Sequence, residues 1–227
     1  MFLRRSLDER RAAAARKAPA GPLRDYLEVP FVDPRSDSRE GRYLTIDLEL
    51  TGLEVDVDEI LSIGYVPIEG RDLVLGGAAH LLIAPSGEVG QSASIHRLTD
   101  DHLAGGMPLE QAMPLVLRAL AGRTLVAHHA AIEVGFLSAA CRRLYGQPLV
   151  VRAIDTMMLQ RRVLRIGPTD EVRAGTMRLQ GARDHFGLPR YRAHEALTDA
   201  MAAGELFLAQ AADLAGSSGI SVKSLSG

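Results

Sequence analysis

Residues 42–53 read RYLTIDLELTGL, an apolar stretch that alternates as a β-strand does. Asp47 and Glu49 stand within it, although Asp and Glu are depleted in strands. Side chains alternate along a strand, so the two carboxylates share one face, about 7 Å apart by the standard rise. A divalent cation between them would remove their repulsion, since Mg²⁺ and Mn²⁺ prefer oxygen ligands. A half-exposed strand with two solvated acids is the alternative explanation of this pair.

A second polar group follows about 80 residues later, in TLVAHHAAIEVGFL at residues 124–137. A short apolar strand runs into His128 and His129, and the next helix places Glu133 on its first turn. Helix N-termini favour acidic side chains in any protein, and a histidine at a strand end can be a core or capping residue. This stretch alone therefore leaves a structural role and a catalytic role open.

The third group lies in AHEALTDAMAAGELF, residues 193–207, where His194 precedes a helix that contains Asp199. Neutral histidine accepts a proton near pH 7, so His194 is the natural general base. A histidine and an aspartate at one helix start are ordinary when taken alone. The combination of four carboxylates and a histidine, at a strand end and two helix starts, is unusual. Together these residues predict a two-metal phosphoryl-transfer site.

The patterns along the chain predict an α/β fold. The predicted strands are 43–51, 60–68, 73–84, 123–127 and 149–154. The predicted helices are 107–120, 130–145, 156–164, 176–186 and 195–214. Three meandering strands followed by alternating helices and strands favour a mixed sheet covered by helices.

Composition and charge exclude several classes of protein. The chain has 227 residues, 47% of them hydrophobic, and a net charge of −2, which excludes collagen-like, disordered and uniformly basic proteins. Its single cysteine, Cys141, excludes an intrachain disulfide framework and fits a reducing compartment. The sequence shows neither a secretory signal nor an apolar run of the roughly 18 residues that span a membrane. We therefore expect a cytoplasmic protein without a membrane partner.

The distribution of charge and the positions of proline and glycine divide the chain into three predicted parts. Residues 1–41 are a basic N-terminal segment and connector, 42–214 the catalytic domain, and 215–227 a short flexible tail. A basic helix over 1–17 ends before Pro19, and 19–41 is expected to lie on the surface or to be partly disordered. The basic helix could contact nucleic-acid phosphates, contact a partner protein, or simply be solvated.

The ordered motifs resemble those of the DEDDh 3′–5′ exonucleases, the DnaQ-like family that includes the exonuclease domain of DNA polymerase III epsilon. TIDLELTGL is similar to the first motif, Asp-x-Glu-x-Thr-Gly, and VAHHAAIEVGFL and HEALTDA to the second and third. SIHRLTDDHL and AIDTMMLQRR resemble two further family segments. The resemblance covers about 42–211 and implies an RNase H-like mixed five-stranded sheet flanked by helices.

The resemblance also implies a role for each site residue. The implied ligands of two divalent ions, Mg²⁺ or Mn²⁺, are Asp47, Glu49, Glu133 and Asp199, with His194 as general base. The implied substrate contacts are Thr51, Leu53, His128 and Phe136, with Leu53 as an apolar wedge against the terminal base. Asp155 and Thr156 are expected to be structural, at a junction between strand and helix.

The implied activity is release of nucleoside monophosphates from the 3′ end of single-stranded DNA. Two alternatives stay open: an RNA 3′–5′ exonuclease of the same family, and a catalytically weakened binding module with the exonuclease fold. The short C-terminal tail favours a stand-alone exonuclease over the replicative subunit. No polymerase or repair partner is identified by the sequence.

Four positions depart from the family pattern. Glu133 stands where the family usually has Asp, His129 where it commonly has Asn, Arg97 where it has Gly, and Glu195 where it often has Arg. Glu133 keeps the charge and adds a methylene, about 1.5 Å of reach, and positioning errors near 1 Å can cost on the order of a hundredfold in rate. We therefore expect an active enzyme in which Glu133 slows turnover or favours Mn²⁺ over Mg²⁺.

Overall fold

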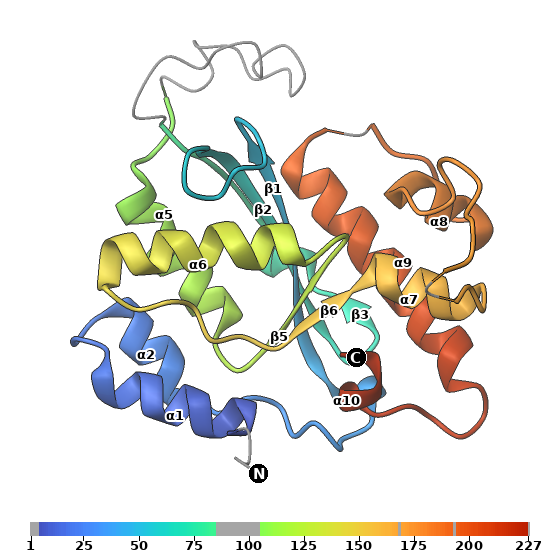
Figure 1. The fold of residues 1–227 in the computed structure, drawn as a ribbon, viewed down its shortest axis with the longest axis horizontal. Coiled ribbons are helices and arrows are strands. Elements are labelled where there is room, and N and C mark those ends of the chain that lie inside the picture. The colour runs from blue at the N-terminus through green and yellow to red at the C-terminus, as the bar shows by residue number, and fades with distance from the viewer. Residues whose placement is uncertain (1–4, 85–104, 168, 193, 227) are drawn as a thin grey trace.

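A mixed sheet forms the centre of the molecule (Figure 1). The computed structural model describes residues 5–84, 105–167, 169–192 and 194–226. The described strands are β1 (Arg42–Leu50), β2 (Ile60–Glu69), β3 (Asp72–Leu73), β4 (Ala79–Leu82), β5 (Thr124–Ala127) and β6 (Ala153–Asp155). Their order is β3-β2-β1-β5-β6, and β4 also pairs with β2. Strands β2, β3 and β4 run antiparallel to their neighbours, whereas β1, β5 and β6 are parallel, which confirms the predicted mixed α/β sheet.

The prediction of five strands is wrong, because the third predicted strand is broken in two. Leu73 pairs with Ile68 and Ala79 pairs with Tyr65, but the 3₁₀ turn η2 (Leu75–Gly77) lies between them. Pro67 explains the break, since proline has no N–H to donate to a neighbouring strand. The Pro67 carbonyl still accepts a hydrogen bond from the Val74 N–H, where the chain turns away.

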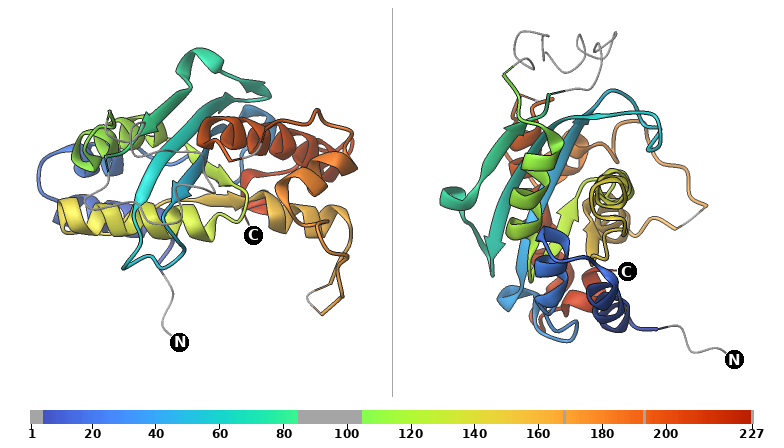
Figure 2. Two further views of the ribbon diagram at one scale, coloured as in Figure 1. Left: turned by 90° about the horizontal axis from the view of Figure 1, so that it is seen from above. Right: turned by 90° about the vertical axis from the view of Figure 1, so that its left-hand side faces the viewer.

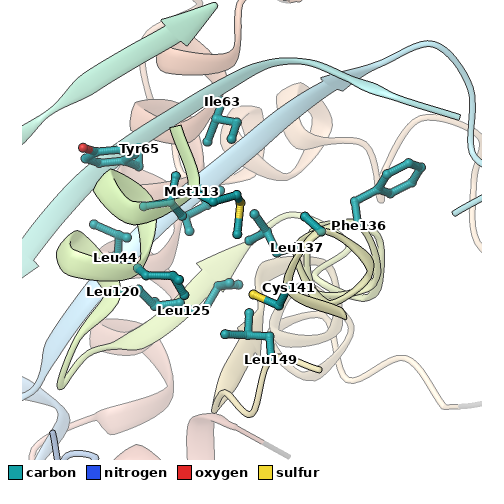
Figure 3. Packing of buried hydrophobic residues seen from close by; sticks show 14 of the residues in the cluster. Leu44, Ile63, Tyr65, Met113, Leu120, Leu125, Phe136, Leu137, Cys141 and Leu149 are labelled. Atoms are coloured by element: carbon teal, nitrogen blue, oxygen red, sulfur yellow. The ribbon is translucent and has the colours of Figure 1, made fainter. Parts of the chain in front are cut away.

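Helices cover both faces of the sheet. Helices α5 (Leu109–Leu120) and α6 (Ala131–Tyr145) pack on the face that contains Leu44, Ile46 and Leu48. Figure 3 shows this cluster, with Met113 of α5 and Leu137 of α6 on the helix side and Leu44 and Leu125 on the strand side. On the other face, α7 (Thr156–Val163) and α9 (Ala196–Ala215) pack against Tyr43, Val126 and Ile154. Helix α8 (Leu179–His185) lies beyond them and contacts α7 and α9.

The predicted connector 19–41 contains a buried helix instead. Helix α1 (Leu7–Lys17) is followed by α2 (Pro22–Glu28), with Leu23, Tyr26 and Leu27 buried in the core. The Tyr26 hydroxyl donates to the Val150 carbonyl oxygen at 2.9 Å. Pro22 has the fixed φ that suits a first helical turn, so this proline begins a helix within the predicted connector.

The predicted flexible tail is also packed. Helix α10 (Val222–Leu225) buries Val222 and Leu225 against the α7–α9 face, and Ser221 forms a β-bridge with Asp37. Figure 2 shows α10 seated against the body of the molecule. The domain boundaries at 42 and 214 stay a prediction. No helix among the described residues is long and apolar enough to cross a membrane, and the cytoplasmic location also stays a prediction.

Candidate active site

Three of the four predicted carboxylates meet where β1 and α9 lie side by side. Asp47 and Glu49 are on the β1 face that packs on α9, opposite the core face of Ile46 and Leu48. One carboxylate oxygen from each of Asp47, Glu49 and Asp199 lies within 4.8 Å of the others. This spacing suits three ligands of one divalent cation, whose bonds to oxygen are about 2.0 to 2.6 Å long.

A glycine in β2 permits this close approach. A Cβ on Gly64 would lie 2.1 Å from the Ala196 carbonyl carbon, at the first residue of α9. Any side chain here would therefore push the start of α9, and with it Asp199, away from β1. Gly204 gives α9 a second close contact, against Thr45 and Leu73.

Asp199 is held by the residue that is predicted to be the general base. The His194 backbone N–H donates to Asp199 Oδ2 at 2.8 Å, and His194 has a φ of +70°, in the left-handed region. This geometry directs the chain back over the first turn of α9. The His194 side chain is exposed beside the carboxylates, where it can meet a water molecule and a phosphate.

The fourth carboxylate, Glu133, is close but outside the group of three. It lies on the first turn of α6 with only 4% of its surface exposed, and its Oε2 has no hydrogen-bond partner among the described residues. Its charge is one of the causes that raise the pKa of Asp47, so the two carboxylates are electrostatic neighbours. A buried, unpartnered carboxylate oxygen is costly, and a cation would satisfy it.

The electrostatics of the cluster favour a cation. Burial raises the pKa of Asp47 well above its usual range, with added repulsion from Glu133, Asp199 and Glu49. Burial raises the pKa of Glu133 to about 8 and that of Glu49 to about 7. The pKa of Asp199 is also raised by burial, although the His194 N–H opposes this effect. Acids that share one buried site shift in this direction, because burial and the like charges of their neighbours both disfavour the ionised form.

Asp155 supports the start of α6 from the neighbouring strand. Its Oδ1 accepts hydrogen bonds from the His129 N–H at 3.0 Å and the Met157 N–H at 2.9 Å, so it both caps α7 and fixes His129. His129 has a φ of +75°, a conformation in which Asn, Asp and His are the enriched residues after glycine. A histidine can therefore replace the family's asparagine here, and the structural role expected for Asp155 includes positioning the helix that contains Glu133.

The predicted substrate-binding residues differ in whether their side chains already form hydrogen bonds within the protein. His128 has both ring nitrogens engaged, with Thr156 Oγ1 at 2.8 Å and with the Met177 carbonyl oxygen at 2.8 Å. Burial lowers the pKa of His128, so we infer a neutral ring that donates from Nε2 and accepts at Nδ1. A substrate could then meet only the carbon edge of this ring. Its predicted contact with substrate stays a prediction.

Two of the other predicted substrate residues follow the end of β1, and the third, Phe136, lies on α6. The Thr51 hydroxyl donates to Asp58 Oδ1 and accepts from the Glu59 N–H, which orders the loop after the strand. Leu53 on that loop is 71% exposed, and its role as an apolar wedge stays a prediction. Phe136 is buried and lines a cavity of about 670 Å³ between this loop and α6. The segment 94–103 and its Arg97 lie outside the described residues.

Comparison with known proteins decides the family. Residues 44–207 match the family model described as exonuclease, of the RNase T type, which is well over half of the chain. This chain belongs to the exonuclease family. It is a hydrolase of the 3′–5′ exonuclease family, and the predicted resemblance is confirmed.

Several curated relatives of this exonuclease are DNA polymerases or polymerase subunits. It is 30% identical to the DNA polymerase III subunit epsilon of Treponema pallidum, over 73% of this chain and 74% of that protein. It is 31% identical to the PolC-type DNA polymerase III of Thermotoga maritima, over 74% of this chain. The chain spans only 12% of that polymerase's length.

Solved structures share the fold at low sequence identity. The nuclease domain of 3′hExo, a DEDDh family member bound to rAMP, has a TM-score of 0.63 and 17% identity, covering 76% of this chain and 92% of that one. Escherichia coli Exonuclease I in complex with a dT13 oligonucleotide has a TM-score of 0.63 and 13% identity, covering 74% and 40%. These likenesses confirm the RNase H-like arrangement of sheet and helices.

Removing divalent cations from the exonuclease is expected to make its stability fall as pH rises. The raised pKa values of Glu133 and Glu49, about 8 and about 7, mean that the folded protein binds protons above pH 4.5 that the unfolded chain releases. Stability gained from these protons is present at low pH and is lost as pH rises through 7 to 8. In EDTA, thermal unfolding should therefore occur about 5 °C lower at pH 8.5 than at pH 6.

The variant Glu133→Gln separates this effect from the pH dependence of the whole protein. In EDTA, Glu133→Gln should reduce the dependence of the melting temperature on pH. Glu171→Gln, at an exposed position, should leave that dependence unchanged. An excess of Mg²⁺ should raise the melting temperature of the wild type more at pH 8.5 than at pH 6. Equal slopes for the wild type and Glu133→Gln would contradict the assignment of the raised pKa to Glu133.

Proposed function

We propose that this chain is a divalent-cation-dependent 3′–5′ exonuclease that releases nucleoside monophosphates from the 3′ end of single-stranded DNA. The observation that supports this most strongly is the approach of Asp47, Glu49 and Asp199 within 4.8 Å, beside the buried and unpartnered Oε2 of Glu133. Only oxygen ligands are present in this group, and such a set suits Mg²⁺ or Mn²⁺.

Each residue has a distinct task in the proposed reaction. Asp47, Glu49, Glu133 and Asp199 would hold two cations, which activate water and neutralise charge on the scissile phosphate when bound. His194, exposed next to Asp199, removes the proton from the attacking water. Leu53 packs against the terminal base, and the Thr51–Asp58 hydrogen bond keeps the Leu53 loop ordered. Attack on the terminal phosphodiester from the side opposite the leaving oxygen releases one nucleotide at a time.

The choice of DNA as substrate has support from the relatives. Several curated relatives are DNA polymerases or polymerase subunits, and the Exonuclease I structure holds an oligonucleotide of deoxythymidine. The 3′hExo nuclease domain is bound to a ribonucleotide, so RNA stays the second candidate substrate. The 2′-hydroxyl is where a protein separates the two nucleic acids.

Digestion of end-labelled oligonucleotides tests the proposal. A 5′-labelled single-stranded DNA and its RNA twin are incubated with Mg²⁺, Mn²⁺ or EDTA. We expect a ladder that shortens from the 3′ end of the DNA, appears with either cation and is absent in EDTA. A ladder from the RNA strand alone would show that the substrate is RNA rather than DNA. Absence of cleavage of both strands by folded protein with both cations would favour the binding module.

The variant Glu133→Asp tests whether the site has adapted to glutamate. Because Glu133 is buried and its neighbours pack around the longer side chain, we expect the shorter aspartate to lower kcat by about 10-fold. Steady-state kinetics with Mg²⁺ and Mn²⁺ measure this change, with Glu171→Asp, at an exposed position, as a control. A large gain of activity in Glu133→Asp would show instead that the natural chain is a weakened exonuclease.

A further inference from the structure

A buried arginine holds the segment that joins α8 to α9 and leads to His194. Arg183 in α8 has 1% of its surface exposed. Its guanidinium donates to the Ala202 carbonyl oxygen at 2.6 Å and to the Pro189 carbonyl oxygen at 2.7 Å. It also donates to Glu205 Oε2 at 2.7 Å. One side chain thus joins α8, the connecting segment and α9.

Tyr191 completes this network from within the connecting segment. Its hydroxyl donates to Glu205 Oε1 at 2.8 Å, and the Arg183 guanidinium carbon lies 4.7 Å from the centre of its ring. Both oxygens of Glu205 are therefore used, one by Arg183 and one by Tyr191. Pro189 and Tyr191 stand five and three residues before His194, so their backbone is fixed close to the predicted base.

Packing alone does not account for this arrangement. A buried ion pair is seldom more stable than well-packed apolar side chains of the same volume, and the Arg183 Nε has no partner among the described residues. His194 lies in the left-handed region at φ +70°, which is less favourable than the usual regions for any residue with a Cβ, so contacts that fix the flanking backbone help to maintain it. On the far side of His194, its N–H is bound to Asp199, on the same helix as Glu205.

We propose that Arg183, Glu205 and Tyr191 are positioning residues for His194. They fasten the connecting segment to α9, so that the base and the carboxylate of Asp199 keep one geometry. This inference rests on the proposed function, in which His194 accepts the proton of the attacking water. The reaction rate is sensitive to displacements of about 1 Å at a reacting group. Leu53, the proposed contact with the terminal base, is not part of this network, so disturbing the network should affect kcat more than substrate binding.

The conservative variant Tyr191→Phe tests the proposal, because it removes one hydroxyl and keeps the ring against Arg183. We expect kcat to fall by about 10-fold while KM changes by less than about twofold. Tyr145→Phe is the matched control, since it makes the same change at a hydroxyl in α6 that has no hydrogen-bond partner among the described residues. This variant should keep the wild-type kcat. Equal losses in both variants, or none in Tyr191→Phe, would overturn the proposal.

A double-mutant cycle with His194→Ala separates positioning from a general loss of stability. If the network acts through His194, Tyr191→Phe should have no further effect on kcat once the histidine is absent. Full additivity of the two changes would overturn the proposal.

Amide hydrogen exchange gives a readout that does not need activity. Exchange at residues 190–192, 194 and 195 should be faster in Tyr191→Phe than in the wild type and unchanged in Tyr145→Phe. If the wild type failed to cleave any strand, the proposed function would fail, while exchange would still report whether the network holds the segment. Unchanged exchange in Tyr191→Phe would overturn the network itself.

Discussion

Replacing Asp47 with asparagine is expected to lower kcat by about 1,000-fold or more. Asp47 is one of the three carboxylates that meet within 4.8 Å, and its pKa is raised by burial and then by the charges of Glu133, Asp199 and Glu49. Loss of its charge weakens cation binding, and the cations contribute several kcal/mol of transition-state stabilisation. Single-turnover cleavage of a 5′-labelled DNA strand at saturating Mg²⁺ measures the loss.

Asparagine keeps the shape of Asp47, so the loss of activity should occur in folded protein. Burial disfavours the charged carboxylate, and Asp47→Asn should therefore melt no lower than the wild type in EDTA. Asp213→Asn, at an exposed position in the same helix as Asp199, should leave kcat unchanged. Activity of Asp47→Asn within tenfold of the wild type would rule out Asp47 as an essential ligand.

Replacing His194 with alanine is expected to lower kcat by about 100- to 10,000-fold, the usual contribution of a general base. The affinity for a 3′ end should change far less, because the carboxylates and Leu53 are unaltered. Rapid-quench kinetics give kcat, and fluorescence titration with a labelled oligonucleotide in Ca²⁺ gives the dissociation constant.

The control for this experiment is His185→Ala, at an exposed histidine in α8. It should retain both the wild-type kcat and the wild-type affinity. Equal losses of turnover and of affinity in His194→Ala would show that His194 binds substrate rather than accepting a proton.

Local patterns predict most of this site. Alternation along β1 places Asp47 and Glu49 on one face, and the structure brings that face to Asp199. Helix starts at 131 and 196 agree with the predicted helices to within one residue. The sequence does not reveal that Glu133 lies beside the group of three rather than within it, because that distance depends on how α6 packs on the sheet.

The missed features depend on contacts between distant segments. Pro67 breaks the edge strand only because its carbonyl and its missing N–H face the neighbouring strand. Pro22 and the i, i+3, i+4 spacing of Leu23, Tyr26 and Leu27 are helical signals that the nearby Gly21 and Pro19 obscure. Arg183 and Glu205 stand 22 residues apart on two helices, and no periodicity joins them.

Anomalous diffraction from crystals grown with Mn²⁺ and a nucleoside monophosphate tests the central claim most directly. We predict two Mn²⁺ peaks about 4 Å apart. One would lie among Asp47, Glu49 and Asp199, and the other would be in reach of Glu133. Asp47→Asn crystals treated in the same way should lose both peaks or retain one at reduced occupancy. No Mn²⁺ at these carboxylates in the wild type, with the nucleotide bound, would contradict the claim that they form the catalytic centre.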